Sequence, residues 1–245
     1  ILFNGMNIYN PSHLFRFFSA FDPDLIKDVT LYKGSIPANY GGRISSVLDI
    51  NSLDGNDKKI TGSAGIGPLT SKFTLEGPLI KDKTTFVLGV RTTYSDWIFK
   101  ALPAEYKNSS ASFDDATIHI SHKLNNKNNF YLNGYISGDK FNLNSDTNYA
   151  YQNKNADIKW KHSFNNRFYS VVTVGVDNYD YAVTGYNNPV NEFKLAYSIN
   201  QDKFNADFSY FLNNKHKLTF GVSSLLYNIH SGTFIPIGKE SLIVP

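Results

Sequence analysis

The stretch "NADIKWKHSF", residues 155–164, places two kinds of side chain on alternate positions. Its apolar members are Ala156, Ile158, Trp160 and Phe164, and its polar members are Asp157, Lys159, Lys161 and Ser163. Successive side chains of a β-strand point to opposite faces of the sheet. The stretch therefore predicts a strand with one apolar face and one charged face. "KFNADFSYFL" (203–212) and "TTFVLGVRTTY" (84–94) repeat the same alternation.

From Lys58 onward this strand pattern recurs between short turns and longer polar segments. Nine strands are predicted, over 59–67, 69–78, 83–95, 113–124, 128–141, 151–164, 167–185, 191–212 and 215–230. The short turns lie at 80–84, 125–129, 165–167 and 213–217, and the longer loops at about 96–112, 142–151, 185–191 and 231–245. Asn tolerates positive φ, so the Asn-rich pairs suit tight hairpins. Short turns at one end and long loops at the other are typical of an outer-membrane β-barrel.

Composition narrows the classes of protein. The chain has 245 residues and a formal charge of +3. It has no Cys, which excludes a disulfide framework and zinc-finger spacing. Its spread-out Lys and Arg argue against nucleic-acid binding. The sequence contains no run of 18 apolar residues, so no transmembrane helix is predicted. The mean hydropathy of −0.31 is compatible with a membrane barrel, because lipid-facing and lumen-facing residues alternate along its strands.

A soluble all-β binding protein, such as a sandwich or propeller, is the alternative fold. Sandwich strands usually have about 5–6 residues, whereas residues 168–184 alternate for longer. Aromatic residues also gather near strand ends, with Trp160 and Phe164 near one end and Tyr94 and Trp97 near the other. Membrane barrels carry such aromatic girdles at both interfaces. The pattern favours the membrane barrel.

Residues 1–55 do not repeat and predict a small α+β unit. "LFNGMNIYN" has an Asn-Gly turn between apolar runs, which predicts a hairpin. "PSHLFRFFSAF", from Pro11, is a plausible helix start. "LIKDVTLYKG" alternates as a strand, and glycines at 34, 41 and 42 break the chain before a second strand at Val47–Ile50.

The stretch "IKDVTLYKGSIPANYGGRISSVLDI", residues 26–50, resembles the end of the plug domain of TonB-dependent outer-membrane transporters. "NGMNIYNPSHLFRFFSAFDPDLIKDV", residues 4–29, resembles the Bacteroidota branch of that family. The resemblance implies a C-terminal part of a plug domain at 1–55 and the N-terminal part of a transmembrane barrel at 56–245. It places the plug in the lumen of an antiparallel barrel. It also implies a plug-to-barrel turn formed by Lys33, Gly34, Tyr40, Gly41, Gly42 and Arg43.

The same resemblance implies a function. Such transporters take up large or scarce nutrients, such as a siderophore, cofactor, glycan or peptide, across the outer membrane. They are not enzymes, and no cofactor is implied. Energy comes from the TonB-ExbB-ExbD complex through a coupling peptide, and a surface lipoprotein lid or other outer-membrane subunits are possible partners besides outer-membrane lipid. The alternative function is a transport-inactive barrel that serves as a structural or scaffold subunit of an outer-membrane assembly.

Candidate substrate contacts follow from the plug resemblance, at its outward apex. They are Tyr9, Asn10, Ser12, His13, Arg16, Phe17 and Phe18. The alternative role for them is packing between plug and barrel. The sequence predicts no catalytic or metal site: Asp114-Asp115 fits a solvated strand entrance, and His119 and His122 are expected on opposite faces of one strand.

Nine strands are fewer than the roughly 22 of such a transporter. We therefore expect a segment of a longer precursor that forms a partial barrel. Residues 1–50 should lie against the concave face of its sheet, and residues 215–230 should form a free edge that other polypeptide completes.

Overall fold

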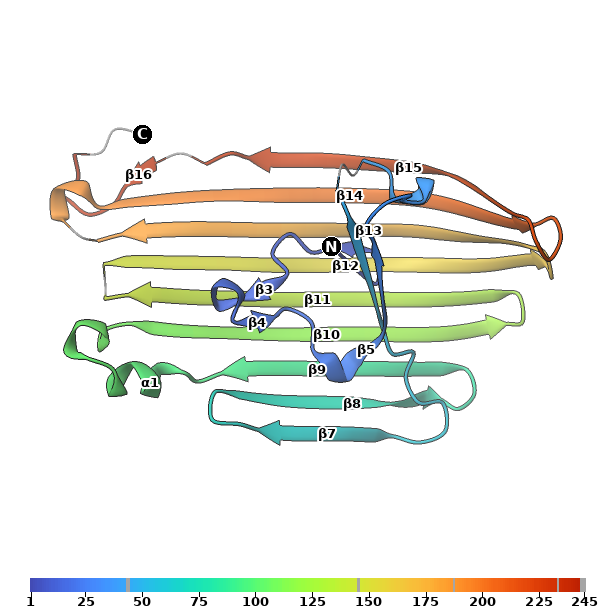
Figure 1. Cartoon of the computed structure of the whole chain (residues 1–245), viewed down its shortest axis with the longest axis horizontal. Helices are drawn as coiled ribbons and strands as arrows, with labels where there is room; N and C mark the ends of the chain where they lie inside the picture. Colours follow the sequence, from blue (N-terminus) through green and yellow to red (C-terminus); the bar gives the residue numbers. More distant parts are fainter. Residues whose placement is uncertain (43–44, 145, 187, 233, 243–245) are drawn as a thin grey trace.

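The computed structural model describes residues 1–42, 45–144, 146–186, 188–232 and 234–242. Most of them form one antiparallel sheet with the strand order β15-β14-β13-β12-β11-β10-β9-β8-β7 (Figure 1). Its strands are β7 (Thr61–Ile66), β8 (Thr70–Ile80), β9 (Thr84–Thr93), β10 (Ser110–Asn125), β11 (Asn128–Leu143), β12 (Thr147–Asn165), β13 (Phe168–Gly185), β14 (Phe193–Phe211) and β15 (Lys217–His230). A short β16 (Phe234–Pro236) pairs with β14 beyond the end of β15. Each of the nine predicted strands is present, β16 adds a tenth strand among the described residues, and β7 and β15 stand at the two ends of the strand order.

Residues 1–55, called here the N-terminal segment, lie across one face of this sheet (Figure 1). Their strands β1 (Leu2–Phe3), β2 (Met6–Asn7), β5 (Ile26–Tyr32) and β6 (Val47–Ser52) form a second sheet in the order β2-β1-β6-β5. The predicted Asn-Gly hairpin joins β1 to β2, with φ of 49° at Asn4 and 80° at Gly5. β3 (Ser12–His13) pairs with β4 (Phe18–Ser19).

The helix expected from Pro11 does not form. The chain instead makes β3, a three-residue turn η1 (Leu14–Arg16) and β4. Leu14 packs with Ala111 and Phe113 of β10. Contact with the large sheet has replaced the local helical preference. The other 3-10 turns of the segment are η2 (Pro23–Leu25) and η3 (Ala38–Tyr40).

The hydrophobic core lies between the N-terminal segment and the large sheet. Phe3, Met6 and Ile50 of the segment are almost fully buried, and Tyr135 of β11 packs with them. The Tyr135 hydroxyl donates to the Ala20 carbonyl at 3.0 Å. This core fixes which face of the sheet is inner.

The outer face carries an apolar band, as the alternation predicted. Ile158 and Val174, neighbours on β12 and β13, are each 56% exposed, whereas Asp157 beside Ile158 is 2% exposed. A row of outward aromatic rings closes the band near the short turns. It contains the contacts Phe130–Trp160, Phe164–Phe168, Phe168–Phe208 and Phe208–Phe220. No helix among the described residues has the length and apolar character needed to cross a membrane.

The two ends of the sheet differ. At one end, here the turn end, the connections are residues 81–83, 126–127, 166–167 and 212–216. At the other, the loop end, they are 67–69, 94–109, 144–146 and 186–192, so two of its connections are short and two are longer. The loop at 94–109 contains helix α1 (Asp96–Ala101) and turn η4 (Ala104–Tyr106), and the loop at 186–192 contains η5 (Pro189–Asn191). The long loop expected at 142–151 is wrong, because β11 and β12 continue pairing up to Leu143 and Thr147.

The route from the N-terminal segment into the large sheet also differs from the expectation. Lys33, Gly34, Tyr40, Gly41 and Gly42 lie in the connection between β5 and β6, inside the N-terminal segment, and Arg43 lies outside the described residues. The chain reaches β7 through residues 53–60 instead. β6 pairs with β1 and β5 and therefore belongs to the small sheet. The crossing to the large sheet begins only after β6 has ended.

Gly55 is the glycine that this crossing requires. Its φ is +84°, and a Cβ there would lie 2.8 Å from the Phe86 carbonyl oxygen. The Thr85 hydroxyl donates to the Asp54 carbonyl at 2.6 Å and holds the crossing against β9. Gly34, by contrast, has open space around its Cβ position, so its expected steric role is not supported.

Gly55→Ala should therefore destabilise the folded chain, by about 1–2 kcal/mol for the left-handed backbone alone and more for the clash with β9. Gly34→Ala is the matched control and should change stability little. Denaturant unfolding of the full-length protein in detergent measures both. Equal effects of the two substitutions would contradict the assignment of the crossing.

The exposed apolar band leads us to expect contact with lipid, and such contact predicts a depth-dependent cost for a charge. Val174→Arg, in the middle of the band, should lower the free energy of unfolding by about 2–4 kcal/mol in lipid. Asn178→Arg, on the same face of the same strand but beyond the band, should cost far less. Unfolding titrations in vesicles compare them, and an equal loss would exclude lipid at Val174.

Candidate functional site

The backbone of residues 4–10 is held by inward-facing side chains of β12, β13 and β14. The Lys203 ammonium donates to the Gly5 carbonyl at 2.9 Å, and the Asp177 carboxylate accepts from the Asn7 amide at 3.0 Å. Three further donors reach carbonyl groups of the segment: Lys159 to Asn4, Asn155 to Asn7 at 2.9 Å and Asn153 to Asn10 at 3.2 Å. These bonds satisfy main-chain groups that pairing within the small sheet leaves without a partner.

Buried charges of opposite sign lie together where the inner face of the large sheet contacts the N-terminal segment. The Lys203 ammonium lies 3.4 Å from an Asp177 oxygen and 3.6 Å from an Asp157 oxygen, and all three side chains are almost fully buried. Gln201 adds neutral contacts, accepting from the Asn7 amide group at 2.9 Å and the Tyr9 hydroxyl at 2.8 Å. A buried charge persists only when it is paired and hydrogen-bonded. The wall and the segment therefore depend on each other.

His13 forms a second anchor toward the loop end. Its Nδ1 lies 2.8 Å from an Asp139 oxygen and its Nε2 lies 3.2 Å from an Asp115 oxygen. The imidazole stacks on Phe113 with 4.1 Å between ring centroids, and the residue is only 1% exposed. The ring is thus clamped between two strands, β10 and β11.

Arg91 of β9 completes this anchor. Its guanidinium contacts Asp115 at 2.7 and 2.9 Å and donates to the Ser19 carbonyl at 3.0 Å. Burial by itself lowers the pKa of His13, but the carboxylates of Asp115 and Asp139 outweigh it, so the pKa is raised above 6.5. We infer that His13 is held in its charged form, which balances the second carboxylate.

The turn directly after His13 has strained backbone. Leu14, Phe15 and Arg16 have φ of 48°, 56° and 81°, a left-handed conformation that costs non-glycine residues about 1–2 kcal/mol each. Side chains of the wall hold it: the Leu14 amide donates to Asp139 at 2.9 Å. Such backbone persists where its surroundings fix it, and it gathers at functional sites.

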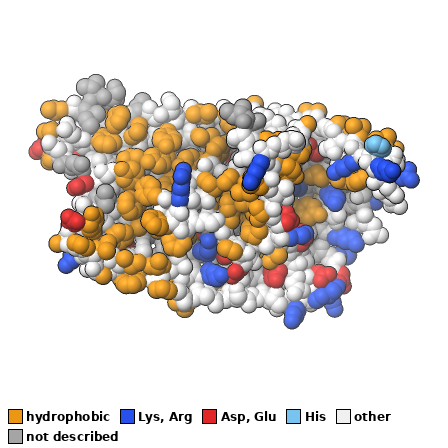
Figure 2. All heavy atoms as spheres, in the orientation of Figure 1, with side chains coloured by type: hydrophobic (Ala, Val, Ile, Leu, Met, Phe, Trp, Pro, Cys, Tyr) orange, Lys and Arg blue, Asp and Glu red, His pale blue; other side chains and the backbone are white. Residues whose placement is uncertain are grey.

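Aromatic rings cover the inner face beside this turn. Phe15 meets Phe141 and Tyr149 edge-on, at 4.9 and 5.6 Å between ring centroids. Three tyrosines in register on β12, β13 and β14 continue the surface: Tyr151, Tyr181 and Tyr197, with centroids 6.4 and 4.8 Å apart. Figure 2 shows hydrophobic side chains gathered toward the loop end, with charged ones toward the turn end. We call the six residues Phe15, Phe141, Tyr149, Tyr151, Tyr181 and Tyr197 the aromatic wall.

Half-buried tyrosines offer flat apolar faces with hydroxyl groups at their edges. Such surfaces bind planar or ring-shaped ligands through stacking and a few hydrogen bonds. The arrangement supplies a surface on which such a ligand could bind. Among the described residues, no group of three or more His, Asp or Glu is placed to hold a metal ion.

The predicted apex residues divide into two groups. Tyr9, Asn10, Ser12, His13 and Phe18 face the wall or each other: Ser12 donates to the Asn10 side chain, and Phe18 packs on Phe113 at 5.3 Å. Arg16 and Phe17 instead face outward, and Phe17 is 84% exposed.

The first group therefore fits the alternative role, which is packing between the N-terminal segment and the large sheet. The outward pair keeps its role as candidate ligand contacts.

The expected turn residues do not join this site. Tyr32 and Tyr40 stack at 5.2 Å, and the Tyr40 hydroxyl donates to Asp49 at 2.7 Å, which closes the β5–β6 connection on itself. Burial and then the Asp49 carboxylate raise the pKa of Tyr40. That connection lies beside β15, away from His13.

The sequence alone did not identify the residues of the large sheet that contact the N-terminal segment, nor the aromatic wall. Asp115 is a buried strand residue, not a solvated entrance, while Asp114 beside it faces outward. The tyrosines had a visible signal in "NYAY" and "NYDYA", where Tyr recurs at alternate positions of strands. His119 and His122 lie on opposite faces as predicted, bonded to Asn133 and Thr84.

The His13 anchor predicts a pH dependence. Because the pKa of His13 is raised in the folded state, its contribution is fully present below the unfolded value of about 6.5 and is lost as pH rises through the folded pKa. Hydrogen exchange of residues 11–19, corrected for intrinsic rates, should therefore accelerate as pH rises through the folded pKa of His13.

His13→Gln should exchange fast at every pH, and His216→Gln, in an exposed turn, should behave like the native protein. Unchanged pH dependence in His13→Gln would contradict the anchor.

No protein-family model matches the sequence, and no curated protein matches it. Three solved receptors share its fold. The ferric preacinetobactin receptor BauA of Acinetobacter baumannii aligns with 96% of this chain at a TM-score of 0.66 and 11% identity. The ferric-catecholate import receptor Fiu of E. coli K12 aligns with 89% at 0.62 and 13%, and the siderophore receptor PiuA of A. baumannii with 85% at 0.56 and 13%.

The chain spans only 42%, 43% and 38% of these receptors' own lengths. At such identities the likeness concerns the fold alone. The chain has the fold of part of a TonB-dependent receptor, with a large antiparallel sheet that matches part of an outer-membrane β-barrel.

Proposed function

We propose that this chain is the end of the plug and the first strands of a barrel in a TonB-dependent outer-membrane transporter of the Bacteroidota type. The observation that carries the proposal is the N-terminal segment itself. It covers the inner face of the sheet, its main chain is bound by wall side chains, and its apex leaves Arg16 and Phe17 exposed beside the aromatic wall. A plug that must both seal a lumen and present a ligand surface needs this arrangement.

The orientation follows from the two ends of the sheet. Outer-membrane barrels have short turns in the periplasm and longer loops outside, so the loop end faces the exterior. The aromatic row near the turn end then lies at the periplasmic interface. Ligand arrives at the aromatic wall and the exposed apex. The TonB-ExbB-ExbD complex would act on the plug from the periplasmic side, and a surface lipoprotein lid could cover the mouth.

The transported ligand is a large or scarce nutrient. The solved receptors of like fold are named for ferric preacinetobactin, for ferric catecholate and for a siderophore, which makes a siderophore the first ligand to test. The aromatic wall suits a ligand with planar or ring faces, a description that also fits some cofactors and glycans.

The His13 anchor has a place in this function. Transport requires the plug to move, so contacts between plug and wall must be strong enough to seal and still reversible. Buried ion pairs meet both needs, because removing one partner is costly while water restores both charges once they are exposed. The strained turn at Leu14–Arg16 would relax when the anchor opens.

Uptake in the parent organism tests the proposal. Deleting the gene should abolish energy-dependent uptake of one nutrient class, and the full-length gene should restore it. Collapse of the proton gradient should abolish the restored uptake. Normal uptake of every tested nutrient, together with a disturbed outer-membrane assembly, would favour the scaffold function instead.

Tyr181→Ala should weaken ligand binding to the purified full-length receptor by about five- to tenfold, the usual loss for one stacked ring of 1–1.5 kcal/mol. Tyr169→Ala, on the inner face near the turn end, is the matched control and should leave affinity unchanged. Isothermal titration measures both, and unaltered binding by Tyr181→Ala would remove the aromatic wall from the site.

A further inference from the structure

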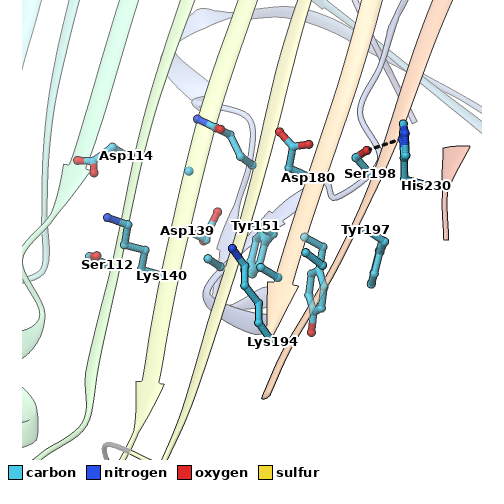
Figure 3. A pocket seen from close by; sticks show the side chains of 16 residues that line it. Ser112, Asp114, Asp139, Lys140, Tyr151, Asp180, Lys194, Tyr197, Ser198 and His230 are labelled. Atoms are coloured by element: carbon cyan, nitrogen blue, oxygen red, sulfur yellow. Dashed lines mark hydrogen bonds between the residues drawn. The ribbon is translucent and has the colours of Figure 1, made fainter. Parts of the chain in front are cut away.

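The outer face of the sheet carries an open cavity of about 590 Å³ near the loop end (Figure 3). Asp139, Tyr151, Tyr181 and Tyr197 point inward at this level, so their neighbours along each strand point outward. The cavity therefore lies mainly on the opposite face of the same strands, and Tyr151, Tyr181 and Tyr197 of the aromatic wall also border it. We call it the outer trough.

Small side chains make the floor of the outer trough. Ala150, Ala182 and Ala196 are register partners on β12, β13 and β14, and Gly138 lies beside them on β11. Three adjacent strands thus carry only a methyl group outward at this height, and Lys140 of β11, the register partner of Ala150, stands beside them. The floor is wide and shallow, which suits a flat polar group lying across the strands rather than a side chain entering a hole.

Two lysines at the rim lack an ion-pair partner among the described residues. They are Lys140 on β11 and Lys194 on β14. The acidic side chains at the rim are already engaged: Asp114 accepts from Thr92, and Asp180 pairs with Lys154 at 3.6 Å. The uncompensated charge of the outer trough is therefore positive, and it favours an anionic ligand.

The height of the trough identifies what lies next to it. On β13 the apolar band ends at Val176, and Asp180 is four residues farther toward the loop end. At about 3.3 Å per residue and a strand tilt near 40°, the trough lies roughly 10 Å beyond the hydrocarbon, at the depth of lipid headgroups. Gln152, Ser198 and His230 supply further polar groups there.

We propose that the outer trough binds the phosphorylated sugar headgroup of an outer-leaflet glycolipid. The sugar rings lie over the alanine floor, where hydroxyl groups meet the polar rim, and phosphate groups reach Lys140 and Lys194. Their strands are three spacings apart, roughly 15 Å between the two backbones, a span that a disaccharide with a phosphate at each end can bridge. The inference rests on the outer-membrane location in the proposed function.

The test uses the purified full-length protein in phosphatidylcholine nanodiscs that contain lipid A, with phosphatidylglycerol as an anionic lipid lacking sugar. Native mass spectrometry counts retained lipid. The native protein should retain lipid A in preference to phosphatidylglycerol. Lys140→Ala and Lys194→Ala should each weaken retention about fivefold, and the double variant roughly 30-fold, if each lysine contributes as basic residues do at anionic membranes.

Two further variants make the result decisive. Lys127→Ala with Lys215→Ala removes the same charge at the turn end and should retain lipid A normally. Ala182→Trp fills the floor without changing charge and should also weaken retention, while heat-modified migration on gels reports whether each barrel is folded.

Equal retention of both anionic lipids, or equal loss in the control pair, would overturn the inference. Retention of free sugar phosphate as strong as that of lipid A would do the same. Transport is not measured in this test, so a receptor that imports its nutrient but holds no glycolipid refutes this inference alone.

Discussion

Everything in this structure depends on how main-chain groups of residues 4–10 are satisfied. The short hairpin of β1 and β2 has too few partners in its own small sheet, and the core beneath it excludes water. An unmet buried carbonyl or amide costs about 1–3 kcal/mol. Lys203, Asp177, Asn155 and their neighbours remove that cost, and they occupy inward positions because the strands alternate. The charged face of the barrel wall is thus a docking surface for peptide backbone.

The two anchors divide the interface by chemistry. Near the turn end the wall binds backbone atoms of the segment, so contact there is insensitive to most side chains of residues 4–7. Near the loop end it binds the side chain of His13, a titratable group that faces two carboxylates. The strained turn that follows lies between this anchor and the exposed Phe17. An event at the apex is therefore mechanically connected to the His13 anchor through three residues.

Alternation along the strands was enough to predict the large sheet, its faces and its open edges, because register and burial share a period of two. The hairpin at Asn4-Gly5 followed from turn chemistry. The helix from Pro11 was wrong because its apolar spacing had a tertiary cause: Leu14 and Phe18 meet Phe113 of β10. No local pattern contains that contact. The role of Lys33, Gly34 and residues 40–42 was misplaced, because glycine-rich turns within a unit resemble those between units in sequence.

The site itself was predictable only in part. His13 stood out as an apex residue, but its partners Asp115 and Asp139 come from strands more than 100 residues away. Their inward positions followed from alternation, yet pairing them with His13 needed the path of the N-terminal segment. The tyrosine pattern was present in the sequence and had a meaning only once the three strands were aligned.

The brief β11–β12 connection at residues 144–146 gives the mouth an uneven rim. Helix α1 and its loop rise beside β9 and β10, and residues 186–192 rise beyond β13, whereas little chain stands between Leu143 and Thr147. Phe141 and Tyr149 lie on the strands next to this short connection, and Phe15 packs against both. The connection at 67–69 is equally short, but it does not lie above these rings. A bulky solute that approaches the aromatic wall from the side of β11 and β12 therefore meets little chain before it reaches Phe141 and Tyr149.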